Sequence, residues 1–122
     1  MAASWTLCFD AADPHRLAAF WAAALGYLPE PGYDDPDGAS IMDPDDHGPA
    51  ISFLRVPEGK TAKNRLHIDI RPTGSTKDEP AIRRRAAELI ALGATHAGDE
   101  SYGGIFSHVV LRDPEGNEFC VA

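Results

Sequence analysis

The second half of this sequence repeats the first, and this repeat limits the fold more than any other feature. Three matches carry it: residues 5–9 with 66–70, residues 25–27 with 92–94, and residues 43–48 with 113–116. A period of about 60 residues is too long for a solenoid repeat and is typical of one supersecondary unit that occurs twice. Neither copy can bury a sheet alone, so both copies should share one domain.

Each copy is expected to run strand, helix, strand, strand, with a further strand as an option. The expected strands span residues 5–9, 39–43, 50–56, 63–71, 105–112 and 117–122, with loops at 29–38 and 97–104. The expected helices begin at Asp13-Pro14 and Asp78-Glu79-Pro80, because aspartate caps a helix and proline fits its first turn. Gly26 and Gly93 should end them. The apolar stripes of the helices are Leu17, Phe20, Trp21 and Ala24, and then Ile82, Ala86, Leu89 and Ile90.

Residues 63–71 (KNRLHIDIR) alternate between polar and apolar side chains. The apolar residues at positions 66, 68 and 70 should point to one face, and His67 and Asp69 to the other, because strand side chains have a period of two. This segment therefore predicts a half-buried strand with a polar second face.

Composition and charge exclude several classes of function. The chain has 122 residues, 43% of them hydrophobic and 25% charged, which suits one globular domain. Its net charge of −8, from 11 Lys and Arg against 19 Asp and Glu, argues against nucleic-acid and anionic-membrane partners. No apolar run could span a membrane, and the N-terminus lacks the features of a signal peptide. Cys8 and Cys120 form no C-x-x-C motif. We therefore expect a cytoplasmic protein with free thiols.

Several motifs, in this order and spacing, make the sequence resemble one superfamily. They are DPHRLAAFW at 13–21, LGY at 25–27, KNRLHID at 63–69, LGA at 92–94 and DPEGNEF at 113–119. Together they resemble the vicinal oxygen chelate (VOC) superfamily, in its glyoxalase/bleomycin resistance protein/dioxygenase branch. The resemblance implies an α+β fold of two βαβββ modules, near 4–57 and 64–122, within a single domain over 1–122. It also implies a curled mixed sheet around a cavity and a homodimer.

The resemblance further implies where metal-using members bind their metal. The corresponding positions here are Thr6, Ser52, His67 and Cys120, of which His67 alone is the expected ligand. Divalent metals need three or four imidazole, carboxylate or thiolate donors. Glu118 should share a strand face with Cys120, so His67, Glu118 and Cys120 could form a reduced site for Zn, Ni, Fe or Mn. We favour no metal and no other cofactor.

Each of these three residues also has a structural interpretation. His67 could hydrogen-bond Asp69 or a neighbouring strand, and Cys120 could be a small buried hydrophobe. Glu118 could form an ion pair across the sheet. Its candidate partners are Arg65, Arg71 and Arg112.

Three of the four ligand positions lack a ligand residue, while the motifs of the fold are intact. This combination favours a binding protein. We expect a small, partly aromatic ligand, because pockets of this kind combine apolar walls with a few polar groups. The predicted binding residues are His67, Asp69, Tyr102, His108, Glu118 and Cys120. His108 would join them only in one strand register, and Tyr102 would reach in from the loop at the cavity mouth.

An enzyme is the alternative: a glyoxalase-like lyase or isomerase, or a dioxygenase that uses a divalent metal at the reduced site. A lyase or isomerase needs a base, for which His67 or Glu118 could serve, and an electrophile. The candidate electrophiles are Arg65, Arg71 and His108. The sequence leaves open the identity of the ligand and whether modules pair within a chain or swap between chains.

Overall fold

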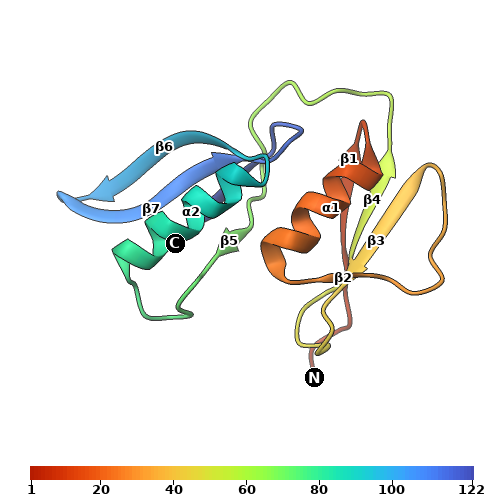
Figure 1. The fold of residues 1–122 in the computed structure, drawn as a ribbon, viewed down its shortest axis with the longest axis horizontal. Coiled ribbons are helices and arrows are strands. Elements are labelled where there is room, and N and C mark those ends of the chain that lie inside the picture. The colour runs from red at the N-terminus through yellow and green to blue at the C-terminus, as the bar shows by residue number, and fades with distance from the viewer. The chain divides into compact units, whose positions relative to one another are not determined.

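Figure 1 shows the structure, a computed structural model that describes residues 1–122. The chain forms two compact units, Met1–Gly59 and Lys60–Ala122. Each unit contains one helix and one four-stranded sheet. Neither helix has the length and apolar character needed to cross a membrane. That the two modules make one domain stays a prediction.

The first unit follows the expected order of strand, helix and three further strands. Its elements are β1 (Leu7–Ala11), α1 (Pro14–Leu25), β2 (Leu28–Pro29), β3 (Gly38–Met42) and β4 (Ile51–Arg55). The sheet order is β1-β4-β3-β2, with β1 parallel to β4 and the other neighbours antiparallel. The first and last strands of the module therefore lie side by side.

The second unit has the same topology. Its elements are β5 (Asp69–Ile70), α2 (Glu79–Ala91), β6 (Thr95–Tyr102), β7 (Ile105–Arg112) and β8 (Glu118–Val121). The order is β5-β8-β7-β6, and β5 is parallel to β8. The strand register is repeated as well. In the first sheet Cys8 lies opposite Ser52, and in the second sheet the residues at the corresponding positions, Asp69 and Cys120, lie opposite each other. The expected α+β fold of two βαβββ modules is thus confirmed.

The helices begin and end where the local sequence predicts. Asp13 accepts a hydrogen bond from the backbone N–H three residues on, at 3.2 Å, and Asp78 does the same at 3.2 Å. Gly26 ends α1 in the left-handed conformation, with φ of 71°, and Gly93 follows α2 with φ of 125°. A residue with a Cβ would be strained at these angles, so glycine suits both positions.

The repeated turns are held by a repeated aspartate. The carboxylate of Asp43 accepts the backbone N–H groups of residues 45, 47 and 48 at 2.9–3.0 Å. Asp113, which is only 3% exposed, accepts those of Glu115 and Asn117 at 2.9 and 3.0 Å, and the Asn117 side-chain amide at 2.8 Å. These hydrogen bonds explain why both turns open with the same residue.

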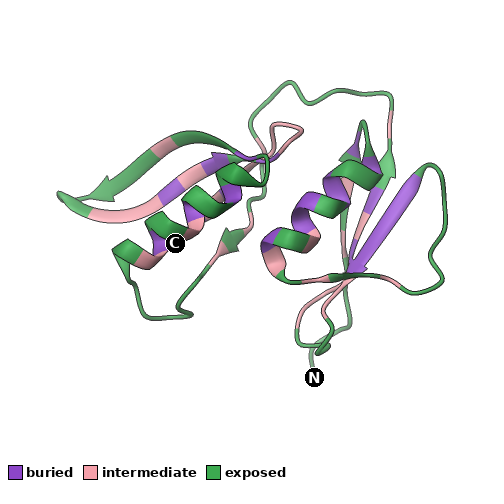
Figure 2. Cartoon of the chain, in the orientation of Figure 1, coloured by how far each residue is buried: buried purple, intermediate pink, exposed green.

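In each unit the apolar stripe of the helix forms the core with the sheet, as the buried residues in Figure 2 show. Leu17 and Trp21 on α1 are fully buried, and the Trp21 ring lies 5.5 Å from that of Phe9 on β1. The core of the second unit includes Ile82, Leu89, Leu111, Phe119 and Val121. Ile90, predicted on the stripe, is 42% exposed, because Leu89 takes the buried position in that turn.

The strand predicted over 63–71 is mostly wrong. Only Asp69 and Ile70 form a strand, the edge strand β5, and Leu66 is 65% exposed. The sequence does alternate, but a strand also needs a neighbour whose backbone groups bond to its own. Residues 63–67 have no such neighbour. The first strand likewise lies two residues later than the predicted 5–9, and Trp5 is 61% exposed.

The loop predicted over 97–104 is also wrong, because most of it belongs to β6. Gly98 is the one half-buried residue of β6 and the others are exposed, so no apolar alternation marks the strand. The hydrogen-bonded pairing with β7 makes it a strand, interrupted by irregularities between His96 and Gly98 and between Glu100 and Ser101. This exposed edge strand could not be recognised from hydrophobic periodicity.

Candidate functional site

Strand alternation in the second unit separates a core face from an open face. On β8, Phe119 and Val121 are buried in the core. Glu118 and Cys120 therefore point to the opposite face. His108 on β7 points to this face as well, because its neighbour Val109 is buried. The sequence left the register of this strand open, and the structure has the register in which His108 joins the predicted binding residues. The open face carries the polar residues that the sequence analysis selected.

These residues line a pocket of about 350 Å³ on the open face. Its walls are Lys63, His67, Asp69, Glu100, Tyr102, His108, Val110, Glu118 and Cys120. All six residues predicted to bind a ligand are among them. The structure thus brings the predicted residues together, while their role in binding stays a proposal.

The sequence analysis missed three lining residues: Lys63, Glu100 and Val110. Glu100 was missed because its strand was taken for a loop, although it lies directly opposite His108 in the β6–β7 pairing. Val110 lies opposite Cys120 in the β7–β8 pairing, so period-two counting from His108 could have found it. The predicted electrophiles Arg65 and Arg71 do not line the pocket.

Glu118 is anchored by the segment that precedes β5. Its Oε1 lies 2.9 Å from the Lys60 Nζ and accepts the Asn64 N–H at 3.0 Å. Burial opposes ionisation, but the Asn64 N–H and the Lys60 ammonium outweigh it and lower the pKa of Glu118 from 4.5 to about 2. The carboxylate therefore stays ionised at neutral pH and is a weak base.

The predicted arginine partners of Glu118 are wrong, because its ion pair is with Lys60. Arg112 lies opposite Glu118 in the β7–β8 pairing without forming an ion pair. The physical reason lies in the short β5, which pairs with β8 only at Cys120 and Val121. The flank of β8 beside Glu118 is thus left to residues 60–64, which supply the lysine.

Cys120 lies between β5 and β7 on the floor of the pocket, with Asp69 on one side and Val110 on the other. Burial raises the pKa of its thiol, and the Asp69 carboxylate adds to this through its charge and a hydrogen bond. Lys63 opposes the shift, and the resulting pKa is about 11. Cys120 therefore carries a protonated thiol at neutral pH, which makes it a poor nucleophile.

The two histidines of the pocket differ in their contacts. Nδ1 of His108 lies 2.9 Å from the Ser107 hydroxyl, and the His108 ring lies 6.3 Å from the Tyr102 ring, tilted by 43°. The expected hydrogen bond between His67 and Asp69 is absent, and the exposed His67 ring has no hydrogen-bond partner. His67 is thus available to a ligand.

The donors in this pocket do not fit a divalent metal. No three His, Cys, Asp or Glu side chains are placed to hold one ion, so His67, Glu118 and Cys120 line one pocket without forming a ligand set. The Glu118 carboxylate is already bound to Lys60 and Asn64. Thr6 and Ser52 belong to the first unit, and hydroxyl groups are poor ligands for such ions.

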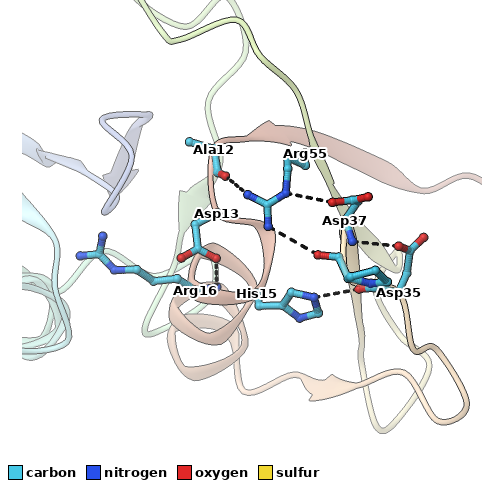
Figure 3. Close-up of polar contacts among 8 residues, drawn as sticks. Ala12, Asp13, His15, Arg16, Asp35, Asp37 and Arg55 are labelled. Atoms are coloured by element: carbon cyan, nitrogen blue, oxygen red, sulfur yellow. Dashed lines mark hydrogen bonds and ion pairs between the residues drawn. The ribbon is translucent and has the colours of Figure 1, made fainter.

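Polar contacts in the first unit support its structure, as Figure 3 shows. Arg55, at the end of β4, donates hydrogen bonds to the Ala12 carbonyl at 2.5 Å and to Asp37 Oδ1 at 3.1 Å. His15 Nε2 lies 2.8 Å from the Asp35 carbonyl. These contacts tie the start of α1 and the end of β4 to the loop before β3.

A duplicated βαβββ module defines the class of protein, since this is the architecture of the VOC superfamily that the sequence resembles. Residues 6–122 match the family described as Glyoxalase-like domain, and the chain belongs to this family. A search of the curated proteins finds no match to the sequence.

Solved structures share the fold at low sequence identity. A glyoxalase/bleomycin resistance protein/dioxygenase family enzyme from Burkholderia phytofirmans PsJN has a TM-score of 0.73 and 17% identity, over 95% of this chain and 94% of that one. A possible glyoxalase from Bacillus cereus has a TM-score of 0.70 and 16% identity, over 99% and 98% of the chains. The fosfomycin resistance protein FosX from Listeria monocytogenes has a TM-score of 0.71 and 12% identity, over 99% and 90%. These likenesses show the fold.

Proposed function

We propose that this protein binds a small, partly aromatic molecule in the pocket of the second unit and does so without a catalytic metal. The observation that carries the proposal is the pocket itself, of about 350 Å³, where His67, Tyr102 and His108 stand beside carboxylates. Ligand pockets in proteins span about 300–1,000 Å³ and combine hydrophobic or aromatic walls with a few placed polar groups. The pocket is within this range, and its walls combine Tyr102, Val110 and the two histidine rings with charged groups.

The state of the candidate metal ligands supports binding over metal catalysis. Glu118 is ion-paired with Lys60, and Cys120 holds its proton at neutral pH. In the solved structure of Listeria FosX, a related fold contains Mn(II) and a phosphonic acid. The donors of this chain would have to leave their present partners to bind such an ion.

A thermal-shift screen of aromatic compounds and peptide antibiotics tests the proposal. A ligand present at about 100 times its Kd adds about 2.7 kcal/mol to the free energy of unfolding and raises the melting temperature. Tyr102→Ala should reduce the shift, because Tyr102 lines the pocket. The matched control is Ile105→Ala on the same hairpin, since Ile105 is 75% exposed and lies outside the pocket. A screen without any stabilising compound, or equal effects of the two variants, would contradict the proposal.

An enzyme of the glyoxalase-like lyase or isomerase type is the second candidate, and the unpartnered ring of His67 favours it. A ring nitrogen without a hydrogen-bond partner can accept a proton from a substrate. Turnover of methylglyoxal and glutathione separates the two candidates, and metal analysis by inductively coupled plasma mass spectrometry, on protein purified without a His tag, shows whether a metal takes part. Binding alone predicts substoichiometric metal that His67→Ala leaves unchanged. About one metal per chain, lost in that variant, together with turnover of methylglyoxal and glutathione, would support the enzyme.

We also propose that the protein is a cytoplasmic homodimer. Large apolar side chains are exposed on both units, and exposed apolar surface often marks an interface. Outside the pocket they include Trp5 on the first unit and Leu66 on the second. Gel filtration should give twice the monomer mass, and elution at the monomer mass would refute the dimer.

A further inference from the structure

We propose that the pocket selects ligands in which a positively charged group, such as an amidinium or ammonium, is attached to a flat aromatic ring. This inference rests on the proposed function, because it names the chemical class of the ligand in the same pocket. Two features of the pocket carry it: its carboxylates without ion pairs and its aromatic wall.

The carboxylates outnumber the cations in the pocket. Glu118 is satisfied by Lys60, and the pair leaves no net charge. Asp69 and Glu100 line the same pocket from β5 and β6, and neither forms an ion pair with a lysine, arginine or histidine. Lys63 is the one cation among the lining residues. The pocket therefore presents two unpaired carboxylates against a single ammonium, and an amidinium could bind a carboxylate through two parallel hydrogen bonds.

The aromatic wall is formed by Tyr102 and His108. Their rings lie 6.3 Å apart at 43°, and the Tyr102 side chain, on a residue that is 67% exposed, is open to a ligand. A planar ring can stack on such a wall, and a cation near the ring face of a tyrosine is attracted by its electron density. The wall carries Glu100 directly opposite His108, so a carboxylate lies beside the stacking surface.

Asp69 and Glu100 border the pocket from opposite edges of the sheet, on β5 and β6. Asp69 lies opposite Cys120 on β8, and Glu100 lies opposite His108 on β7. A cation bound between them would therefore have a carboxylate on either side.

The test uses three probes that share one ring and differ in the charge of one group: benzamidine, benzamide and benzoate. Each is titrated into the full chain and followed by two-dimensional NMR, which reports both affinity and location. Benzamidine should bind about fivefold more tightly than benzamide, and benzoate more weakly than both. The shifts should lie on pocket residues, and added salt should weaken the binding of benzamidine.

Variants that each remove one carboxylate charge identify the residues responsible for the preference for a cationic ligand. Asp69→Asn and Glu100→Gln should each weaken benzamidine binding by about threefold to tenfold and leave benzamide almost unchanged. The control is Glu88→Gln, which changes the net charge equally but lies on α2, where Glu88 pairs with Arg85 at 2.7 Å. This control should bind benzamidine like the unmodified chain.

Equal binding of the three probes, tighter binding of benzoate, or shifts outside the pocket would overturn the charge preference and leave the binding function intact. Absence of binding by every probe would overturn this inference as well. If the broad thermal-shift screen also found no ligand, the proposed function itself would fail. The two failures are therefore distinguishable.

Discussion

Replacing Glu118 with glutamine should destabilise the protein measurably at neutral pH. The side chain is only 11% exposed, and its carboxylate holds the Lys60 ammonium at 2.9 Å and the Asn64 N–H at 3.0 Å. A fall in pKa from 4.5 to about 2 corresponds to about 3 kcal/mol of stabilisation when the group is ionised. The glutamine oxygen still accepts the Asn64 N–H, so we expect Glu118→Gln to cost about 1–2 kcal/mol in the free energy of unfolding.

The effect should depend on pH in a defined direction. The folded-state pKa of Glu118 lies below the unfolded-state value, so its stabilisation is complete above 4.5 and is lost as pH falls toward about 2. Urea unfolding of the unmodified protein and of Glu118→Gln, at about pH 7 and about pH 3, measures the difference in their free energies of unfolding. Less than half of this difference should remain at about pH 3.

The matched control for this prediction is Glu88→Gln on α2. Its partner Arg85 lies 2.7 Å away, but the Glu88 side chain is 52% exposed. Exposed pairs contribute about 0–1 kcal/mol, so this variant should change the stability little. A Glu118→Gln cost no larger than that of the control, or a cost equal at both pH values, would refute the anchoring role of Glu118.

Three further predictions concern the turn, the core and the thiol. Asp113→Ala should lower the free energy of unfolding by about 2–3 kcal/mol in urea titrations, because three N–H groups lose a buried acceptor; a loss under about 0.5 kcal/mol would contradict this. Leu89→Ala should cost about 2–5 kcal/mol by the same measurement, since Leu89 is fully buried, and a neutral result would disprove its place in the core. In a Cys8→Ser background, the alkylation rate of Cys120 by iodoacetamide should keep rising with pH toward the thiol pKa of about 11. A rate that levels off near neutral pH would show a thiolate instead.

Much of the fold could be predicted because its signals are local. Asp13 and Gly26 mark the ends of α1 through hydrogen bonds and backbone angles confined to a few residues. The Asp-Pro turns behave in the same way, since Asp113 bonds to groups within four residues. Repetition of these signals in both halves was sufficient to predict two modules of one topology.

The candidate site was only partly predictable. Asp69 was found through the period of two within strands, and His67 and Cys120 through the ligand positions that the family resemblance implies. Glu100 and Lys63 were missed, because an exposed edge strand and an irregular segment show no apolar pattern. Sequence spacing could not reveal which residues from other strands would lie beside them.

The sequence by itself determined the two modules, their helices and the turns, since these depend on contacts between near neighbours in the chain. The tertiary structure alone decided the chemistry of the pocket. Lys60 and Glu118 are 58 residues apart, yet their ion pair, together with the Asn64 N–H, lowers the pKa of the carboxylate in the pocket wall. The sheet order β5-β8-β7-β6 brings Asp69 and Glu100 to act on one cysteine. Burial and charge depend on such distant neighbours, so the pKa values of Glu118 and Cys120 emerge only when the chain is folded.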